Sequence, residues 1–188
     1  MPTTHALVIG AGQAGLAVSR CLTEQGREHV VLDRGRVGQR WRSNSWDSLH
    51  LLTPNWMNTL PGETYAGRVP DGFASAAAFV EHLAGYAESF GAPVEGRAAV
   101  RLLRKRGDLF EVVTQRAVWR ARSVVIATGW CDLPAVPAAT TTWPPASISS
   151  RRATTASRAH CRTAACWSSE PRRPACNSPT SCRPQGAT

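Results

Sequence analysis

Several features are missing from this sequence, and each absence narrows the classes of protein to consider. No run of about 18 apolar residues occurs, so we expect no transmembrane helix and no membrane partner. The start has no basic segment ahead of an apolar one, so we expect no signal peptide and a cytoplasmic protein. The six cysteines follow no zinc-ribbon or CxxC spacing, so we expect no metal site.

Positive charge is abundant, but it is concentrated toward the end of the chain. The formal net charge is +9. Residues 139–188 hold seven arginines and a single acid, Glu170, and so carry +6, which leaves +3 for residues 1–138. Nucleic-acid binding needs basic residues on a structured face with stacking aromatic side chains. The arginines of 139–188 follow no period, so we expect no nucleic-acid partner.

One stretch near the start carries the strongest functional signal. The apolar residues 5–9 run directly into a Gly-x-Gly-x-x-Gly motif at residues 10–15. A helical run to Gly26 and a second apolar strand that ends at Asp33 follow. Strand, glycine turn, helix, strand and acidic residue, in this order, form the βαβ unit that binds dinucleotides.

Each glycine of the motif has an expected physical role. Gly10 lets the backbone turn out of the strand, Gly12 lets a pyrophosphate approach the main chain, and Gly15 lets the helix pack closely on the sheet. The helix N-terminus offers N–H groups and the positive end of its dipole to the phosphates. Asp33 is placed to accept hydrogen bonds from a ribose 2′-hydroxyl and would repel a 2′-phosphate. We therefore expect a ribose diol, as in FAD or NAD.

Residues 34–72 are predicted to be irregular and contain three tryptophans, Trp41, Trp46 and Trp56. Aromatic content argues against disorder, and long loops in compact domains are often functional. Two interpretations stay open for these side chains. They cap the hydrophobic core, or they form a wall around a flat ring system.

The rest of the pattern predicts a Rossmann-like α/β domain with a small antiparallel β meander, over residues 1–138. A buried parallel strand at residues 123–127 leads into Thr128 and Gly129, and should bring them close to the glycine turn. Cys21 is predicted on the apolar side of the first helix. The other predicted elements are a helix at residues 73–90, a parallel strand at 93–95 and meander strands at 98–104, 109–114 and 117–121.

On these residues the chain resembles the first part of an FAD-dependent, flavin-containing-monooxygenase-like oxidoreductase. The resemblance covers residues 5 to 138 and rests on the glycine motif, Asp33, Gly38…Trp41-Arg42, Trp46-Asp47-Ser48-Leu49, and Ala127-Thr128-Gly129 followed by Pro134 and Pro137. It implies that the glycine motif holds the ADP part of FAD, that Trp41, Arg42 and Asp47 lie near the flavin, and that Thr128 and Gly129 close over it. It also implies that a second glycine-motif domain binds NADPH, which reduces the flavin before a small-molecule substrate is oxygenated.

The resulting candidate site binds a cofactor and contains no catalytic residue, because His5, His50 and His82 are isolated histidines. Its predicted members are Gly10, Gly12, Gln13, Ala14, Gly15, Asp33, Arg34, Trp41, Arg42, Trp46, Asp47, Thr128 and Gly129. Two other functions stay open. One is a single-domain NAD- or FAD-binding module without catalysis. The other is a relative of the pyridine-nucleotide disulfide reductases. These enzymes use a redox pair of cysteines, and Cys21 and Cys131 do not supply such a pair.

Residues 139–188 depart from the pattern of the preceding part. The segment has no leucine and no valine, so it cannot bury much apolar surface and we expect it to be unstructured. With G/C-rich codons chosen for the back-translation, residues 162–186 read in a shifted frame give an apolar strand, a Gly-Ala-Ser-Ala-Thr-Gly turn and an amphipathic helix. We interpret the segment as an out-of-frame tail that stands in place of the NADPH-binding unit. For this chain we expect weak or no FAD binding and no NADPH-driven turnover.

Overall fold

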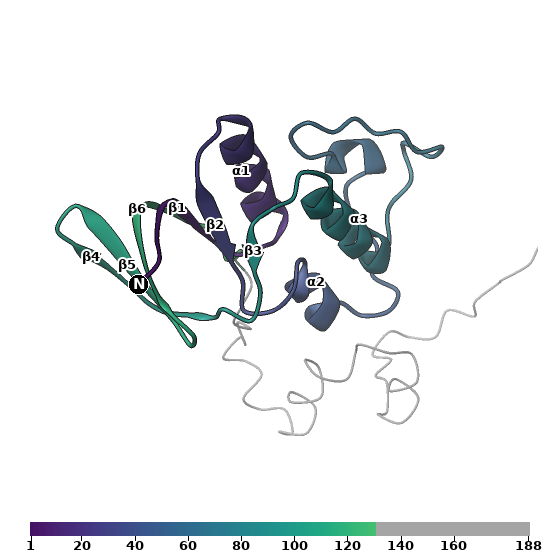
Figure 1. Ribbon diagram of the computed structural model, residues 1–188. Helices are drawn as coiled ribbons and strands as arrows, with labels where there is room; N and C mark the ends of the chain where they lie inside the picture. Colours follow the sequence, from purple (N-terminus) through teal and green to yellow (C-terminus); the bar gives the residue numbers. More distant parts are fainter. Residues whose placement is uncertain (131–188) are drawn as a thin grey trace, which may run out of the picture.

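A six-stranded sheet organises residues 1–130, which are the residues that the computed structural model describes (Figure 1). The strands lie in the order β3-β2-β1-β6-β5-β4. In chain order the elements are β1 (Thr3–Ile9), α1 (Gln13–Glu24), β2 (His29–Leu32), α2 (Gln39–Asn44), the 3-10 helix η1 (Asn55–Asn58), α3 (Ala76–Ser89), β3 (Val94–Glu95), β4 (Val100–Arg106), β5 (Leu109–Thr114) and β6 (Val118–Ile126). Figure 1 shows α2 and α3 beyond the β3 end of the sheet, and the β4–β5 hairpin at the opposite end.

β1 is the central strand and is covered on both faces. It pairs in parallel with both β2 and β6, and β2 pairs in parallel with β3. Successive side chains of a strand point to opposite faces. Accordingly Leu7 and Ile9 belong to one buried cluster, and Val8 packs with Val31 in another. Burial on both faces is typical of a parallel strand in an α/β fold, and the predicted Rossmann-like architecture is confirmed.

The antiparallel part of the sheet differs from the prediction in one respect. We predicted separate strands at residues 117–121 and 123–127, but β6 is one continuous strand. It pairs antiparallel with β5 over Val118–Ala121 and parallel with β1 up to Ile126. The polar residues in the middle of β6 are exposed and do not interrupt it. Residues 123–127 were also predicted to be buried, and this is wrong. Val124, Val125 and Ala127 are only half-buried, and Ile126 is 66% exposed.

The buried face of α1 was predicted only in part. Leu16 is fully buried, but Cys21 is exposed and Ser19 occupies the interior instead. The hydroxyl of Ser19 lies 2.8 Å from Nε2 of His29, and Nδ1 of His29 lies 2.9 Å from the carbonyl oxygen of Arg27. A carbonyl only accepts, so Nδ1 of His29 donates to Arg27, while Nε2 is paired with the hydroxyl of Ser19. This pair of hydrogen bonds lets two polar side chains replace the expected cysteine in the interior.

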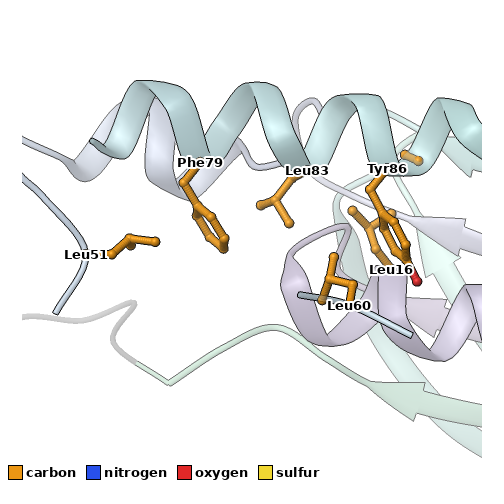
Figure 2. Close-up of a cluster of buried hydrophobic side chains, with 7 residues drawn as sticks. Leu16, Leu51, Leu60, Phe79, Leu83 and Tyr86 are labelled. Atoms are coloured by element: carbon orange, nitrogen blue, oxygen red, sulfur yellow. The ribbon is translucent and has the colours of Figure 1, made fainter. Parts of the chain in front are cut away.

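α3 matches its predicted helix but begins at Ala76, because Ser75 caps it. The hydroxyl of Ser75 accepts a hydrogen bond from the N–H of Ala78 at 3.2 Å, as an N-cap serine should. One face of α3 then packs on α1. Figure 2 shows Phe79, Leu83 and Tyr86 pointing from α3 toward a cluster that also contains Leu16, Leu51, Leu60 and Ala87.

Residues 34–72 contain more regular structure than predicted, since α2 and η1 both fall within them. The predicted end of the domain at residue 138 and the predicted unstructured, out-of-frame tail at 139–188 lie outside the described residues. Within residues 1–130, no helix has both the length and the apolar character needed to span a membrane.

Candidate cofactor site

The turn between β1 and α1 can be built only with glycine at two of its three motif positions. A Cβ at Gly10 would lie 2.4 Å from the carbonyl oxygen of Ala127, and the φ angle of Gly10 is +113°. A Cβ at Gly15 would lie 1.8 Å from the carbonyl oxygen of Gly10. Both contacts are with backbone atoms that cannot move aside cheaply. The close approach of helix to strand that we predicted from Gly15 is therefore present.

Gly12 has different surroundings from the other two glycines. No described atom outside the turn and helix lies within 4 Å of the position that its Cβ would take. Gly12 is also the N-cap of α1, which has no side-chain cap, so Gln13 and Ala14 begin the helix. The first N–H groups of an α-helix have no partner within the helix. A Cβ at Gly12 would therefore fill space beside N–H groups that suit a phosphate.

Asp33 connects this turn to the loop that follows β2. Its Oδ2 accepts a hydrogen bond from the N–H of Ala11 at 2.8 Å, and its Oδ1 accepts one from the N–H of Gly35 at 2.7 Å. Each carboxylate oxygen has two lone pairs, so both can accept a further hydrogen bond from a ribose hydroxyl. Sequence reasoning anticipated the position of Asp33 but not its bond to Ala11, which joins residues 22 positions apart.

The end of β6 lies against the same turn, as predicted. The N–H of Ala127 donates to the carbonyl oxygen of Ile9 at 2.8 Å. The backbone nitrogen of Thr128 lies 3.3 Å from the position of a Cβ on Gly10. Thr128 and Gly129 are exposed, and Gly129 has a φ angle of +74°. The structure thus gathers the glycine turn, Asp33 and the end of β6 at one edge of the sheet.

Residues 34–72, which contain the three tryptophans, are hydrogen-bonded near their beginning to the turn between β1 and α1. The N–H of Gly38 donates to the carbonyl oxygen of Ala11 at 3.0 Å, so α2 starts beside the turn. Trp41 on α2 is half-buried and meets the ring of Phe79 edge-on, with centroids 5.2 Å apart. Trp41 therefore covers the core, whereas Trp46 and Trp56 are 49% and 52% exposed and do not.

Three charged residues of the predicted site lie on its surface. Arg34, Arg42 and Asp47 are all exposed. Nε of Arg42 donates to the carbonyl oxygen of Val37 at 3.2 Å, which holds this side chain against the loop before α2. Their predicted placement near a flavin stays a prediction. Among the described residues, no group of three or more His, Cys, Asp or Glu side chains could hold a metal ion.

Comparison with known proteins agrees with this geometry. The pyridine nucleotide-disulphide oxidoreductase family matches residues 7–149. A CzcO-like uncharacterized oxidoreductase of Geobacillus kaustophilus is 36% identical over 132 residues, which are 70% of this chain and 37% of that protein. An indole-3-pyruvate monooxygenase, YUCCA4 of rice (Oryza sativa subsp. japonica), is 31% identical over 150 residues, covering 70% of this chain and 34% of that one.

A solved structure gives the same result. A flavin-containing monooxygenase from Stenotrophomonas maltophilia superposes with a TM-score of 0.64 at 28% identity, over 73% of this chain and 42% of that chain. The chain thus spans little more than a third of the length of these relatives. The chain belongs to the pyridine nucleotide-disulphide oxidoreductase family, as a flavin monooxygenase-like oxidoreductase.

Proposed function

We propose that residues 1–130 form the FAD-holding part of an NADPH-using, flavin-dependent monooxygenase. The observation that carries this proposal is the open space at Gly12, next to the N-terminus of α1 and to Asp33. An exposed main chain, helix N–H groups and a ribose-directed carboxylate are the parts that a dinucleotide needs. The monooxygenase names of similar proteins support the class of reaction.

The residues of this chain would act on FAD by binding and orienting it. The N–H groups at the start of α1 would donate hydrogen bonds to the pyrophosphate, and Gly12 would leave room for it. Asp33 would accept hydrogen bonds from the ribose while its bond to Ala11 keeps the turn in place. When bound, FAD supplies the redox chemistry, which is to take a hydride from NADPH and react with O₂.

The redox cysteine pair expected for the disulfide-reductase alternative is not found within residues 1–130. Such a reductase needs two cysteines beside its flavin. Cys21 is the one cysteine in residues 1–130, and it is exposed on α1. Titration of FAD and NAD distinguishes our proposal from a non-catalytic NAD- or FAD-binding module. A preference for FAD, with flavin absorbance retained on purification, favours the oxidoreductase.

A matched pair of variants tests the proposal. Gly12→Ala adds one methyl group where the protein itself has space, so the fold should persist while FAD loses its approach to the main chain. Gly85→Ala makes the same change at an exposed position of α3 that also has open space. We expect weak FAD binding to the wild-type chain and to Gly85→Ala, and at least about tenfold weaker binding to Gly12→Ala. Equal FAD affinity in all three proteins would contradict the proposal.

A further inference from the structure

The surface has a hollow that is not lined by the glycine motif. Its volume is about 710 Å³, and it is lined by α2, α3, β3 and the loops that follow β2, α3 and β3. None of the residues at positions 10–15 lines it. Sites for small molecules commonly have volumes of about 300–1,000 Å³, so this hollow has the size of a ligand site.

The lining combines a small-residue floor with positive charge. Ala84, Ala87 and Ala92 contribute short apolar side chains, and three arginines line the same hollow: Arg36, Arg42 and Arg97. Glu88 is the single acid in the lining. The formal charge of the lining is therefore +2. A guanidinium presents a planar set of donors that matches a carboxylate or a phosphate.

Two of the three guanidinium groups have no competing protein partner. Within residues 1–130, the side chains of Arg36 and Arg97 form no hydrogen bond and no ion pair. The third, Arg42, donates through Nε to the carbonyl oxygen of Val37, and this single bond fixes its direction while leaving its terminal N–H groups. Guanidinium N–H donors of Arg36, Arg42 and Arg97 are therefore available in the lining of the hollow.

Arg97 also has an unusual backbone. Its φ angle is +55°, and it is the one non-glycine residue in the described part of the chain with a positive φ. The N–H of Arg97 donates to the carbonyl oxygen of Gly35 at 3.1 Å, and the next residue donates to the carbonyl oxygen of Asp33 at 2.7 Å. Strained backbone of this kind persists where its surroundings fix it, and it is concentrated at ligand sites. Here the strain is at an arginine that lines the hollow.

We propose that this hollow binds a small organic anion, with its carboxylate or phosphate on the guanidinium groups of Arg36, Arg42 and Arg97 and its apolar body on the alanine floor. The size of the hollow, its positive charge, its unpartnered guanidinium groups and the strained Arg97 all point to this one ligand class. The site shares Arg42 with the residues predicted near the flavin, but none of the residues 10–15 that would hold the FAD pyrophosphate lines it.

Three probes that share a phenyl ring test the class of ligand. Phenyl phosphate, benzoate and benzylamine are each titrated into the full chain. Binding is measured by calorimetry and by the NMR chemical shifts of the backbone amides. We expect at least one anion to bind and to shift the amides of Gly35, Gly96 and Arg97, and benzylamine not to bind. Whichever of phenyl phosphate and benzoate binds with the higher affinity shows whether the site prefers a phosphate or a carboxylate. Equal binding of benzylamine, or no binding of either anion at millimolar concentration, overturns the proposal.

Two variants locate the binding. Arg97→Gly removes a guanidinium, and glycine accepts a φ of +55° without strain, so the fold should be kept. It should weaken binding of the anion at least about tenfold. Arg116→Ala removes an exposed arginine that does not line the hollow and should leave binding unchanged. Unchanged binding in Arg97→Gly, or displacement of the anion by FAD, overturns a separate anion site.

Discussion

Gly10, Gly12 and Gly15 are chemically identical but meet different surroundings. Backbone oxygens block any side chain at Gly10 and Gly15, whereas the space at Gly12 is open. The first and third glycines are therefore required by the protein itself. The second is required only if a ligand occupies the space beside it, so stability and FAD binding should respond differently to substitutions at these positions.

We expect Gly15→Ala to lower the free energy of unfolding by about 1–3 kcal/mol, because overpacking against a rigid backbone atom costs about this much. The measurement is denaturant unfolding followed by circular dichroism. Gly85→Ala is the control, and it should raise stability by about 0.5–1 kcal/mol, as expected for glycine replaced in an exposed helix. If the Gly15→Ala protein were as stable as wild type, α1 would not pack closely enough on the β1–α1 turn to exclude a methyl group at residue 15.

The buried Tyr86 predicts a pH dependence of stability. Burial raises the pKa of its phenol from 10.0 to about 12, with a further contribution from Glu63. The folded state then holds the proton more tightly than the unfolded state. The resulting stabilisation is complete below pH 10 and is lost as the pH rises toward about 12.

The expected loss over this range is about 2 kcal/mol. Tyr86→Phe has no phenol at this position, so its stability should fall less steeply over the same pH range. It should also be less stable at neutral pH, because Tyr86 donates a hydrogen bond to the carbonyl oxygen of Pro61 at 2.7 Å. The same alkaline slope in the wild-type and Tyr86→Phe proteins would refute the assignment.

At the scale of elements, Asp33 joins two segments of the chain, the turn before α1 and the loop before α2. It links the start of α1, through Ala11, to the loop before α2, through Gly35. The N–H of Gly38 donates back to the carbonyl oxygen of Ala11, which closes the connection. The shape of the nucleotide turn therefore depends on β2 and α2 as well as on the glycines.

We expect Asp33→Asn to lower the free energy of unfolding by about 1–3 kcal/mol, since an amide NH₂ would face one of the two N–H donors. FAD binding should weaken in the same protein. Thermal unfolding and FAD titration measure the two effects, and Asp71→Asn, in an exposed loop, serves as the control. If Asp33→Asn bound FAD as wild type does, the ribose role of Asp33 would be wrong.

At the scale of the whole molecule, the chain carries one glycine fingerprint and matches 37% of the length of its Geobacillus relative. Our interpretation of residues 139–188 as out of frame predicts no steady oxidation of NADPH when the 188-residue chain is assayed with FAD, as followed by NADPH absorbance. If the chain oxidised NADPH steadily and Gly12→Ala abolished this oxidation, NADPH would bind without a second glycine fingerprint.

The gene tests the interpretation of residues 139–188. We expect the coding sequence to carry a one-base shift near residue 139, after which the other frame encodes a second glycine turn. An uninterrupted frame through this region would refute the shift, and it would leave the FAD-site predictions unaffected.

The sequence by itself determined the βαβ unit, the helix that became α3 and the family. These depend on neighbouring residues, since apolar spacing, glycine positions and one terminal acid are all local along the chain. Only the tertiary structure decided that β6 is one strand, that Ser19 rather than Cys21 is buried, and that Trp41 covers the core. Each of these results depends on a partner far away in sequence: β1 for β6, His29 for Ser19 and Phe79 for Trp41. Local periodicity carries no information about such partners, because only the folded chain brings them together.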